Sequence, residues 1–106
     1  MFKERRKHER YHTLTSAQVK SDDHLDSLFS AEILNISRSG LMFKTMSFYE
    51  SGKKLFFSLQ PLPYDIEGTV KRVNHASDSY FHSVEFDGSI KLATNDIFKI
   101  ISRKLF

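Results

Sequence analysis

The strongest constraint on the fold of this chain is a series of six short apolar segments separated by turn-forming residues. The segments are rich in β-branched and aromatic residues, and breaks such as "SDDHLD" and "SRSG" carry Ser, Asp and Gly. The pattern predicts six strands, at 13–20, 28–36, 40–46, 53–60, 64–75 and 79–86. Alternation of apolar and polar residues, as in Leu55/Phe57/Leu59 and Phe29/Ala31/Ile33, predicts that each strand buries one face.

A different period begins after Gly88. Apolar residues recur there at steps of three and four, which predicts an amphipathic helix over 90–104: Ile90, Ala93, Ile97, Ile100, Ile101 and Leu105. A chain of 106 residues, 40% of them apolar, has the size of one domain with one core. Six short strands and a helix predict a mainly β fold, a small antiparallel barrel with a C-terminal helix. Gly68, inside the fifth segment, predicts a bend or bulge.

The charge of the chain is concentrated at its N-terminus. Residues 1–12 contain five Lys or Arg and two Glu, so they carry the whole formal net charge of +3. A local basic cluster on a neutral body indicates one anionic partner at one place, and argues against a nucleic-acid surface. The absence of Cys, of a secretory h-region and of a long apolar run predicts a cytoplasmic location without membrane insertion.

The basic segment "ERRKHERYH" contains His8-Glu9-Arg10-Tyr11-His12, which fits the H-E-x-x-H pattern of zinc peptidases. That site requires two His on one face of a buried helix, and this segment has no apolar helical period. The neighbouring cations would also oppose a divalent metal. We therefore expect no metal site, and interpret the two His as incidental.

Two other short motifs share the chemistry of anion and base recognition. Arg6 and Arg10 form an R-x-x-x-R pair, and a guanidinium group can pair bidentately with phosphate or with the O6 and N7 edge of guanine. In "NISRSG", Asn35 offers an acceptor and two donors, Ser37 a hydroxyl, and Gly40 a backbone open to positive φ and close approach. Taken alone, the first motif is better explained as a solvated basic tail and the second as an ordinary Ser-type turn.

In combination, R-x-x-x-R before the first strand and N-x-S-x-x-G at a hairpin resemble the motifs of the PilZ domain family. "EGTVKRVN" (67–74) and "HSVEF" (82–86) are similar to later strands of the family. The resemblance implies a six-stranded β-barrel with a C-terminal helix, formed by residues 13–106, and a flexible N-terminal ligand-binding arm, residues 1–12. It also implies binding of cyclic di-GMP, a bacterial second messenger, and signalling by docking on a protein partner.

The resemblance also assigns the ligand-binding residues. Arg6 and Arg10 match arginines that hold guanine and phosphate groups, and Arg5 adds a phosphate contact or stacking surface. Asn35 and Ser37 match positions that contact a guanine, and Gly40 fixes the turn. Two departures affect affinity: Asn35 stands where an acidic residue is commoner, and Ser83 where Gly is common.

Three alternatives stay open from the sequence. An enzyme would use paired carboxylates, and Asp65/Glu67 and Glu85/Asp87 have same-face spacing, but no nucleophile or phosphate-loop motif accompanies them. A nucleic-acid-binding barrel would expose aromatic platforms, whereas alternation places most Phe residues in the core. The third is a barrel of the same fold that binds no nucleotide and acts as a protein adaptor. We expect no catalysis, no nucleic-acid partner and no cofactor.

Overall fold

The computed structural model describes residues 9–21, 29–88 and 91–102. Its seven elements alternate with short turns along the chain: β1 (Tyr11–Ser21), β2 (Phe29–Ile36), β3 (Gly40–Thr45), β4 (Lys54–Ser58), β5 (Asp65–Ala76), β6 (Ser79–Phe86) and α1 (Thr94–Ser102). Each of the six predicted strands is present, within two residues of its expected bounds at nearly every end. The mainly β fold with a C-terminal helix is confirmed.

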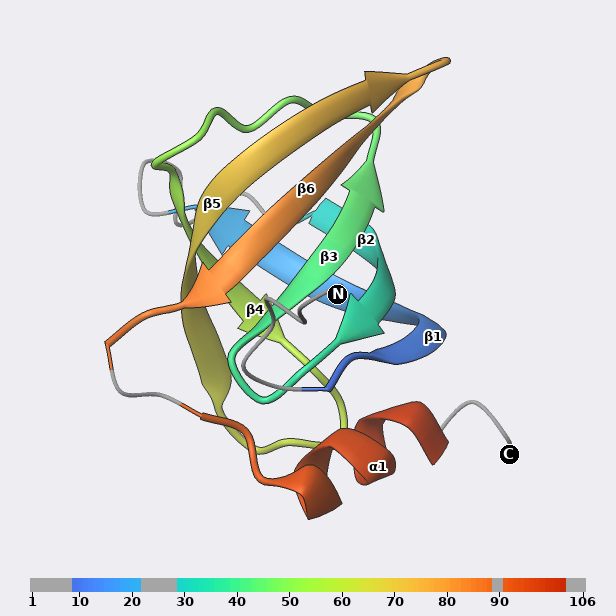
Figure 1. The fold of residues 1–106 in the computed structure, drawn as a ribbon, viewed down its shortest axis with the longest axis vertical. Coiled ribbons are helices and arrows are strands. Elements are labelled where there is room, and N and C mark those ends of the chain that lie inside the picture. Colours follow the sequence, from blue (N-terminus) through green and yellow to red (C-terminus); the bar gives the residue numbers. More distant parts are fainter. Residues whose placement is uncertain (1–8, 22–28, 89–90, 103–106) are drawn as a thin grey trace, which may run out of the picture.

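The six strands form one closed antiparallel barrel in the order β1-β2-β3-β6-β5-β4. Closure comes from pairing of β1 with β4, where Val19 lies opposite Phe57 and Ser21 opposite Leu55. Strands β3, β6 and β5 lie side by side across the front of the barrel in Figure 1, and the β5–β6 hairpin projects at the top. Because every strand has two partners, no sheet edge is left open.

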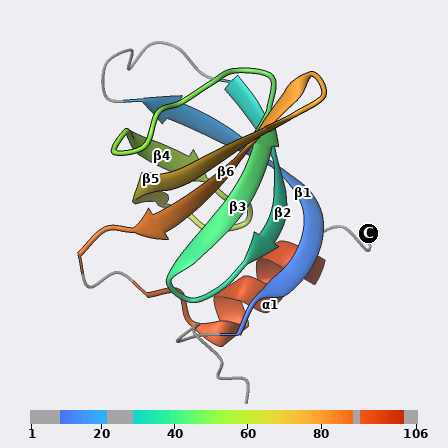
Figure 2. The same ribbon diagram turned by 45° about the horizontal axis from the view of Figure 1, so that its top comes forward.

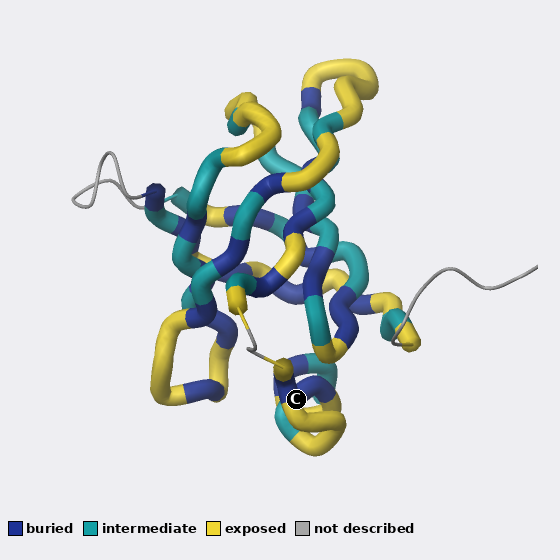
Figure 3. Tube along the Cα trace, turned by 60° about the vertical axis from the view of Figure 1, so that its left-hand side comes forward, coloured by how far each residue is buried: buried dark blue, intermediate teal, exposed yellow. Residues whose placement is uncertain are grey.

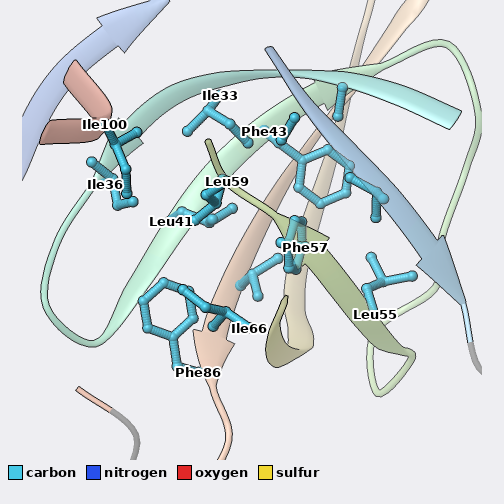
Figure 4. Close-up of a cluster of buried hydrophobic side chains, with 14 of the residues drawn as sticks. Ile33, Ile36, Leu41, Phe43, Leu55, Phe57, Leu59, Ile66, Phe86 and Ile100 are labelled. Atoms are coloured by element: carbon cyan, nitrogen blue, oxygen red, sulfur yellow. The ribbon is translucent and has the colours of Figure 1, made fainter. Parts of the chain in front are cut away.

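The core follows from the two-residue period of the strands. Buried and more exposed positions alternate along β1, β4 and the first half of β5 (Figure 3), and the inward side chains meet in the cluster of Figure 4. Phe43 and Phe57 are fully buried there, with ring centroids 5.5 Å apart, so neither can stack on a nucleic-acid base. The predicted alternation through Leu55, Phe57 and Leu59 is confirmed.

Helix α1 covers the lower end of the barrel beside the start of β1 (Figure 2). Its buried residues are Ile97 and Ile100, and both belong to the core cluster, in which Figure 4 labels Ile100. Asp96 in the first turn and Lys99 in the last complement the helix dipole. The helix is shorter than predicted at its start, because residues 91–93 are not helical and Leu92 is buried without being part of α1.

The bulge expected at Gly68 lies further along β5. Gly68 stays in regular register opposite Leu55 and Phe86, and the register against β6 shifts between Val70 and Arg72. The prediction was wrong about the place because Gly68 serves close packing. A Cβ on Gly68 would lie 2.6 Å from Val84 Cγ1, so the glycine lets β6 approach β5.

One polar side chain, His82, is fully buried within the apolar core. Its ring stacks on Phe43 at a centroid distance of 4.5 Å, and its Nε2 accepts a hydrogen bond of 3.1 Å from the backbone N–H of Tyr49. Burial lowers the pKa of His82 to about 4, from 6.5. The neutral imidazole is thus the form that the folded barrel holds.

This burial makes stability depend on pH. Because the folded pKa is depressed, the contribution of His82 is fully present above pH 6.5 and is lost as the pH falls toward 4. We expect the free energy of unfolding to fall by about 2 kcal/mol between pH 8 and pH 5. Urea unfolding at a series of pH values measures the slope. His82→Gln, which keeps an acceptor for Tyr49, should lose this part of the slope, and equal slopes in both proteins would contradict the assignment.

Candidate functional site

Arg10 and Asn35, which belong to the two separate motifs, lie in direct contact. Arg10 immediately precedes β1, and Asn35 is the last residue but one of β2. The antiparallel register sets His12 opposite Asn35, so the start of β1 lies beside the end of β2. Arg10 Nη1 donates a hydrogen bond of 2.8 Å to Asn35 Oδ1. Both side chains are half-buried, which leaves part of each open to a ligand.

Ser37 is buried and supports the turn between β2 and β3. Its backbone N–H donates to the Gly40 carbonyl at 2.8 Å, and its Oγ accepts from the Ser39 N–H at 3.2 Å. The Oγ also donates to the Gly40 carbonyl at 3.3 Å. The hydroxyl therefore bonds its own turn, in the manner of an ordinary Ser-type turn.

Gly40 is required for a reason other than the expected one. The glycines with positive φ in the described residues are Gly52 and Gly88, and Gly40 is not among them. A Cβ on Gly40 would lie 2.3 Å from the Val84 carbonyl oxygen, far inside van der Waals contact. The close neighbour at Gly40 is thus the backbone of β6, whereas the sequence suggested the close approach of a ligand, and Gly40 does not use the positive φ that glycine permits.

The turn is fastened to the end of β6 and to the segment before α1. Arg38 Nε donates to the Leu92 carbonyl at 3.0 Å, and the Leu92 N–H donates to the Arg38 carbonyl at 2.8 Å. The Phe86 N–H donates to the Ser39 carbonyl at 2.8 Å. These bonds hold Asn35 and its neighbours in one place. The role of Arg38 was missed from the sequence, because its partner lies 54 positions away.

Asn35 has a second neighbour that the motifs do not include. Its Nδ2 lies 3.9 Å from the sulfur of Met42, the residue opposite it on β3. Met42 is half-buried on the outer face of the barrel, since the flanking Leu41 and Phe43 point into the core. Only the cross-strand register identifies this contact, and the register becomes visible only in the fold.

The carboxylates pair differently from the sequence-based pairs. Glu67 and Asp87, from β5 and the end of β6, share the ammonium group of Lys54 at 2.8 and 2.9 Å. Thr69 Oγ1 donates to Asp87 Oδ1 at 2.7 Å. Burial raises the pKa of Asp87, but hydrogen bonds from Thr69 and Lys54 outweigh it and hold the pKa below its usual value. A carboxylate held ionised by a lysine is a structural group and a poor general base.

The H-E-x-x-H segment does not have the helical structure that a zinc site would need at His12. His12 lies on β1, exposed, whereas H-E-x-x-H requires both His on one helix face. His8 lies outside the described residues, as do Arg5 and Arg6. Within the described ranges, no three His, Cys, Asp or Glu side chains gather so that they could hold a metal ion. In the same ranges, no helix has the length and apolar character needed to cross a membrane.

A polar cavity of about 550 Å³ opens on the outer face of the barrel beside the turn. Its walls come from the turn, from β5 and from the end of β6: Ser39, Thr69, Lys71, Glu85, Phe86, Asp87, Gly88 and Lys91. Cationic and acceptor groups both line it. The turn between β2 and β3 therefore has the contact between Arg10 and Asn35 on one side and this cavity on the other. Together, the contact and the cavity can take a ligand with anionic groups and flat polar rings.

Comparison with known proteins places the chain in a family. The PilZ domain family model matches residues 4–100, nearly the whole chain. The structure resembles the PilZ domain of YcgR from Escherichia coli, solved with c-di-GMP, with a TM-score of 0.67 and 13% identity; the match covers 96% of this chain and 95% of that one. A sequence search of curated proteins found no match.

Two longer proteins show the same fold. The Bacillus subtilis inhibitor of motility, MotI or DgrA, matches 96% of this chain with a TM-score of 0.65 and 19% identity. MrkH of K. pneumonia, solved as a complex with c-di-GMP, matches 96% with a TM-score of 0.62 and 18% identity. The match covers 52% of MotI and 51% of MrkH, so this chain spans about half of each.

Proposed function

We propose that this chain, which belongs to the PilZ domain family, is a receptor for cyclic di-GMP. The observation that carries the proposal is the hydrogen bond of 2.8 Å between Arg10 and Asn35. It joins the R-x-x-x-R and N-x-S-x-x-G motifs at one place on the barrel. Two structural neighbours were solved with this dinucleotide, which supports the same ligand class here.

The chemistry of Arg10 and Asn35 suits a guanine nucleotide. Arg10 has a planar fork of N–H donors for the O6 and N7 atoms of guanine or for a phosphate oxygen. Asn35 has an amide that can both donate to and accept from a base edge. The hydrogen bond between them orients the guanidinium group before the ligand arrives, which reduces the conformational entropy lost on binding.

The remaining residues of the proposed site act with these two. We assign Arg5 and Arg6, in the arm of residues 1–12, to the phosphates and the exposed base face. Ser37 and Gly40 contribute through the turn: the bonds inside it and the tight approach to β6 hold its backbone in one shape. We propose that binding also fixes the part of the arm that precedes Arg10 against the barrel, at an entropic cost of about 1–2 kcal/mol per ordered residue.

The output of this receptor is a protein contact. The liganded arm and the outer face of the barrel form a new surface, and we propose that an effector protein docks on it. The proposed function is binding, and two of the described carboxylates, Glu67 and Asp87, are held by the ammonium group of Lys54. Because cyclic di-GMP is a bacterial messenger, the proposed place of action is the bacterial cytoplasm.

Isothermal titration of cyclic di-GMP into the purified protein at moderate salt tests the proposal, with GTP as the control. We expect saturable binding with a micromolar or lower dissociation constant for the cyclic ligand, weaker at higher salt. The melting temperature should rise with ligand. Absence of both heat and a melting shift would refute the receptor and favour an adaptor that works by protein contacts alone.

A further inference from the structure

A row of outward side chains crosses four neighbouring strands of the barrel. The register sets Ser16 on β1 opposite Glu32 on β2, and Glu32 opposite Lys44 on β3. Lys44 in turn lies opposite Phe81 on β6. Each of the four has a buried neighbour on its own strand, so each points away from the core. From β1 to β6 the row is therefore small, acidic, basic and aromatic.

The two charges of this row are not neutralised within the described part of the chain. Glu32 and Lys44 are half-buried neighbours on adjacent strands, yet neither forms an ion pair with another described residue. The ammonium nitrogen of Lys44 lies 6.0 Å from the centroid of the Phe81 ring, on the side away from β2. An acid and a base that stand side by side without partners fit a surface that presents the same two groups in reverse order.

The next row toward the end of β3 combines a hollow with an exposed apolar side chain. A shallow cavity of about 380 Å³ opens on the outer face there, where Ser16 and Ser30 have small side chains. Met46, the residue after β3, stands at its rim and is 75% exposed, more than any other large apolar side chain in the described residues. Ser30 and Met46 lie two residues beyond Glu32 and Lys44, so they lie at about the same level of the sheet.

We infer that this face is a contact between two copies of the chain. The face consists of Ser16, Ser30, Glu32, Lys44, Met46 and Phe81. It lies toward the end of β3 that points away from α1 in Figure 1, and it includes no residue of the two ligand motifs. The inference therefore does not rest on the proposed function.

Two-fold symmetry makes this face complementary to itself. An axis that runs along the strands between β2 and β3 exchanges β2 with β3, and β1 with β6. Glu32 of each copy then lies against Lys44 of the other, and Ser16 of each lies against Phe81 of the other. Met46 of each copy enters the hollow at Ser30 of the other. Every acid thus meets a base and every large side chain meets a small one, as a closed two-fold contact requires.

The size of the face predicts a weak dimer. Three strand spacings and about six residues of each strand give a contact of roughly 14 by 20 Å. A standard stable interface buries about 800 Å² on each partner, which is more than this face offers. We therefore expect a dissociation constant of about 100 μM, so the chain is a monomer in dilute solution and a dimer in concentrated solution.

The rotational correlation time from ¹⁵N relaxation, measured on the full chain from about 20 μM to about 1 mM, tests the contact. For the wild type we expect it to double nearly with concentration. Glu32→Lys and Lys44→Glu should each weaken association at least tenfold, because like charges then face each other across the axis. The double variant should associate like the wild type.

An equimolar mixture of the two single variants is the sharpest arm of the experiment. In a mixed dimer every introduced charge faces its opposite, so the mixture should associate at least as tightly as the wild type although each variant alone does not. An effect of either substitution on the fold of its own chain would not be repaired by mixing. Melting temperatures should stay within a few degrees of the wild type.

Met46→Ser tests the apolar part of the contact, and we expect about tenfold weaker association. Tyr64→Ser is its matched control. Tyr64 is 50% exposed and precedes β5, and the pair β4 and β5 lies opposite the pair β2 and β3 in the barrel order. Tyr64→Ser should therefore associate like the wild type.

Three outcomes would overturn the inference. A correlation time that stays at the monomer value throughout would show that no second copy covers this face, which would then be open to a different protein. Equal association of the wild type and both single charge variants would place the dimer contact on another surface. A mixture that associates no better than its components would exclude the two-fold pairing. Titration with cyclic di-GMP tests the receptor proposal separately.

Discussion

We expect Arg10→Ala to abolish cyclic di-GMP binding, with a loss of affinity of at least about 100-fold. Arg10 belongs to the arm motif and bonds Asn35 of the turn motif, so its removal takes away a charge-assisted contact and also frees Asn35 from its 2.8 Å partner. The core contains no part of this side chain. The melting temperature without ligand should therefore change little, and calorimetry beside thermal unfolding measures both effects.

His8→Ala is the matched control for Arg10→Ala, because it removes a large polar side chain from the same segment. It should leave binding nearly unchanged if the two His are incidental. A zinc-dependent activity that disappears in His8→Ala would instead restore the peptidase interpretation. Equal binding by Arg10→Ala and the wild type would show that the arm is not part of the ligand site.

Gly40→Ala should destabilise the fold by about 3 kcal/mol, the upper end of the typical cost of overpacking a close-packed position. The new Cβ would lie 2.3 Å from the Val84 carbonyl oxygen, and backbone atoms of a paired strand cannot rotate away. Strands β3 and β6 would have to separate where Gly40 lies opposite Glu85. Urea unfolding at pH 7 measures the loss.

Gly68→Ala is the comparison for Gly40→Ala. Its new Cβ would meet Val84 Cγ1 at 2.6 Å, the end of a side chain, and the Glu85 carbonyl at 3.1 Å. A side chain can shift more cheaply than a backbone, so we expect a smaller loss of stability than in Gly40→Ala. A change below 1 kcal/mol in Gly40→Ala would show that β3 and β6 can separate easily, contrary to the close approach.

The strands and the helix could be predicted because their signals are local. A half-buried strand repeats every two residues, so Leu55 and Phe57 reveal both the strand and its buried face. The barrel was also predicted, from six such strands joined by short turns and followed by one helix. The start of the helix was harder to predict from the sequence, because Ala93 continues the three- and four-residue spacing although the helix begins at Thr94.

The features that were missed depend on register between strands. The bulge between Val70 and Arg72 exists only relative to β6, and nothing in "TVKRV" distinguishes it from a regular strand. Gly68 was the local signal for a bulge, but its role is to admit Val84. Similarly, Glu67 and Asp87 meet around Lys54 because β4, β5 and β6 bring them together, whereas spacing along the chain suggested other pairs.

For the candidate site, the motifs identified residues but not the contacts between them. The sequence placed Arg10 and Asn35 in separate motifs, and the pairing of β1 with β2 supplies their hydrogen bond. Arg72 lies within "EGTVKRVN" (67–74), but nothing in that segment relates it to Asn35. Only the register of four strands shows that the two residues lie in one cross-strand row.

The closure of the barrel by β1 and β4 has a consequence for how the chain folds. The two strands are separated along the chain by β2 and β3, so their pairing must overcome the entropy of closing a long loop, and such non-local contacts make folding slow. Until they pair, β1 and β4 each present an unpaired edge. An open edge of this kind is a template for pairing with another chain. The interval before closure is therefore when aggregation competes with folding.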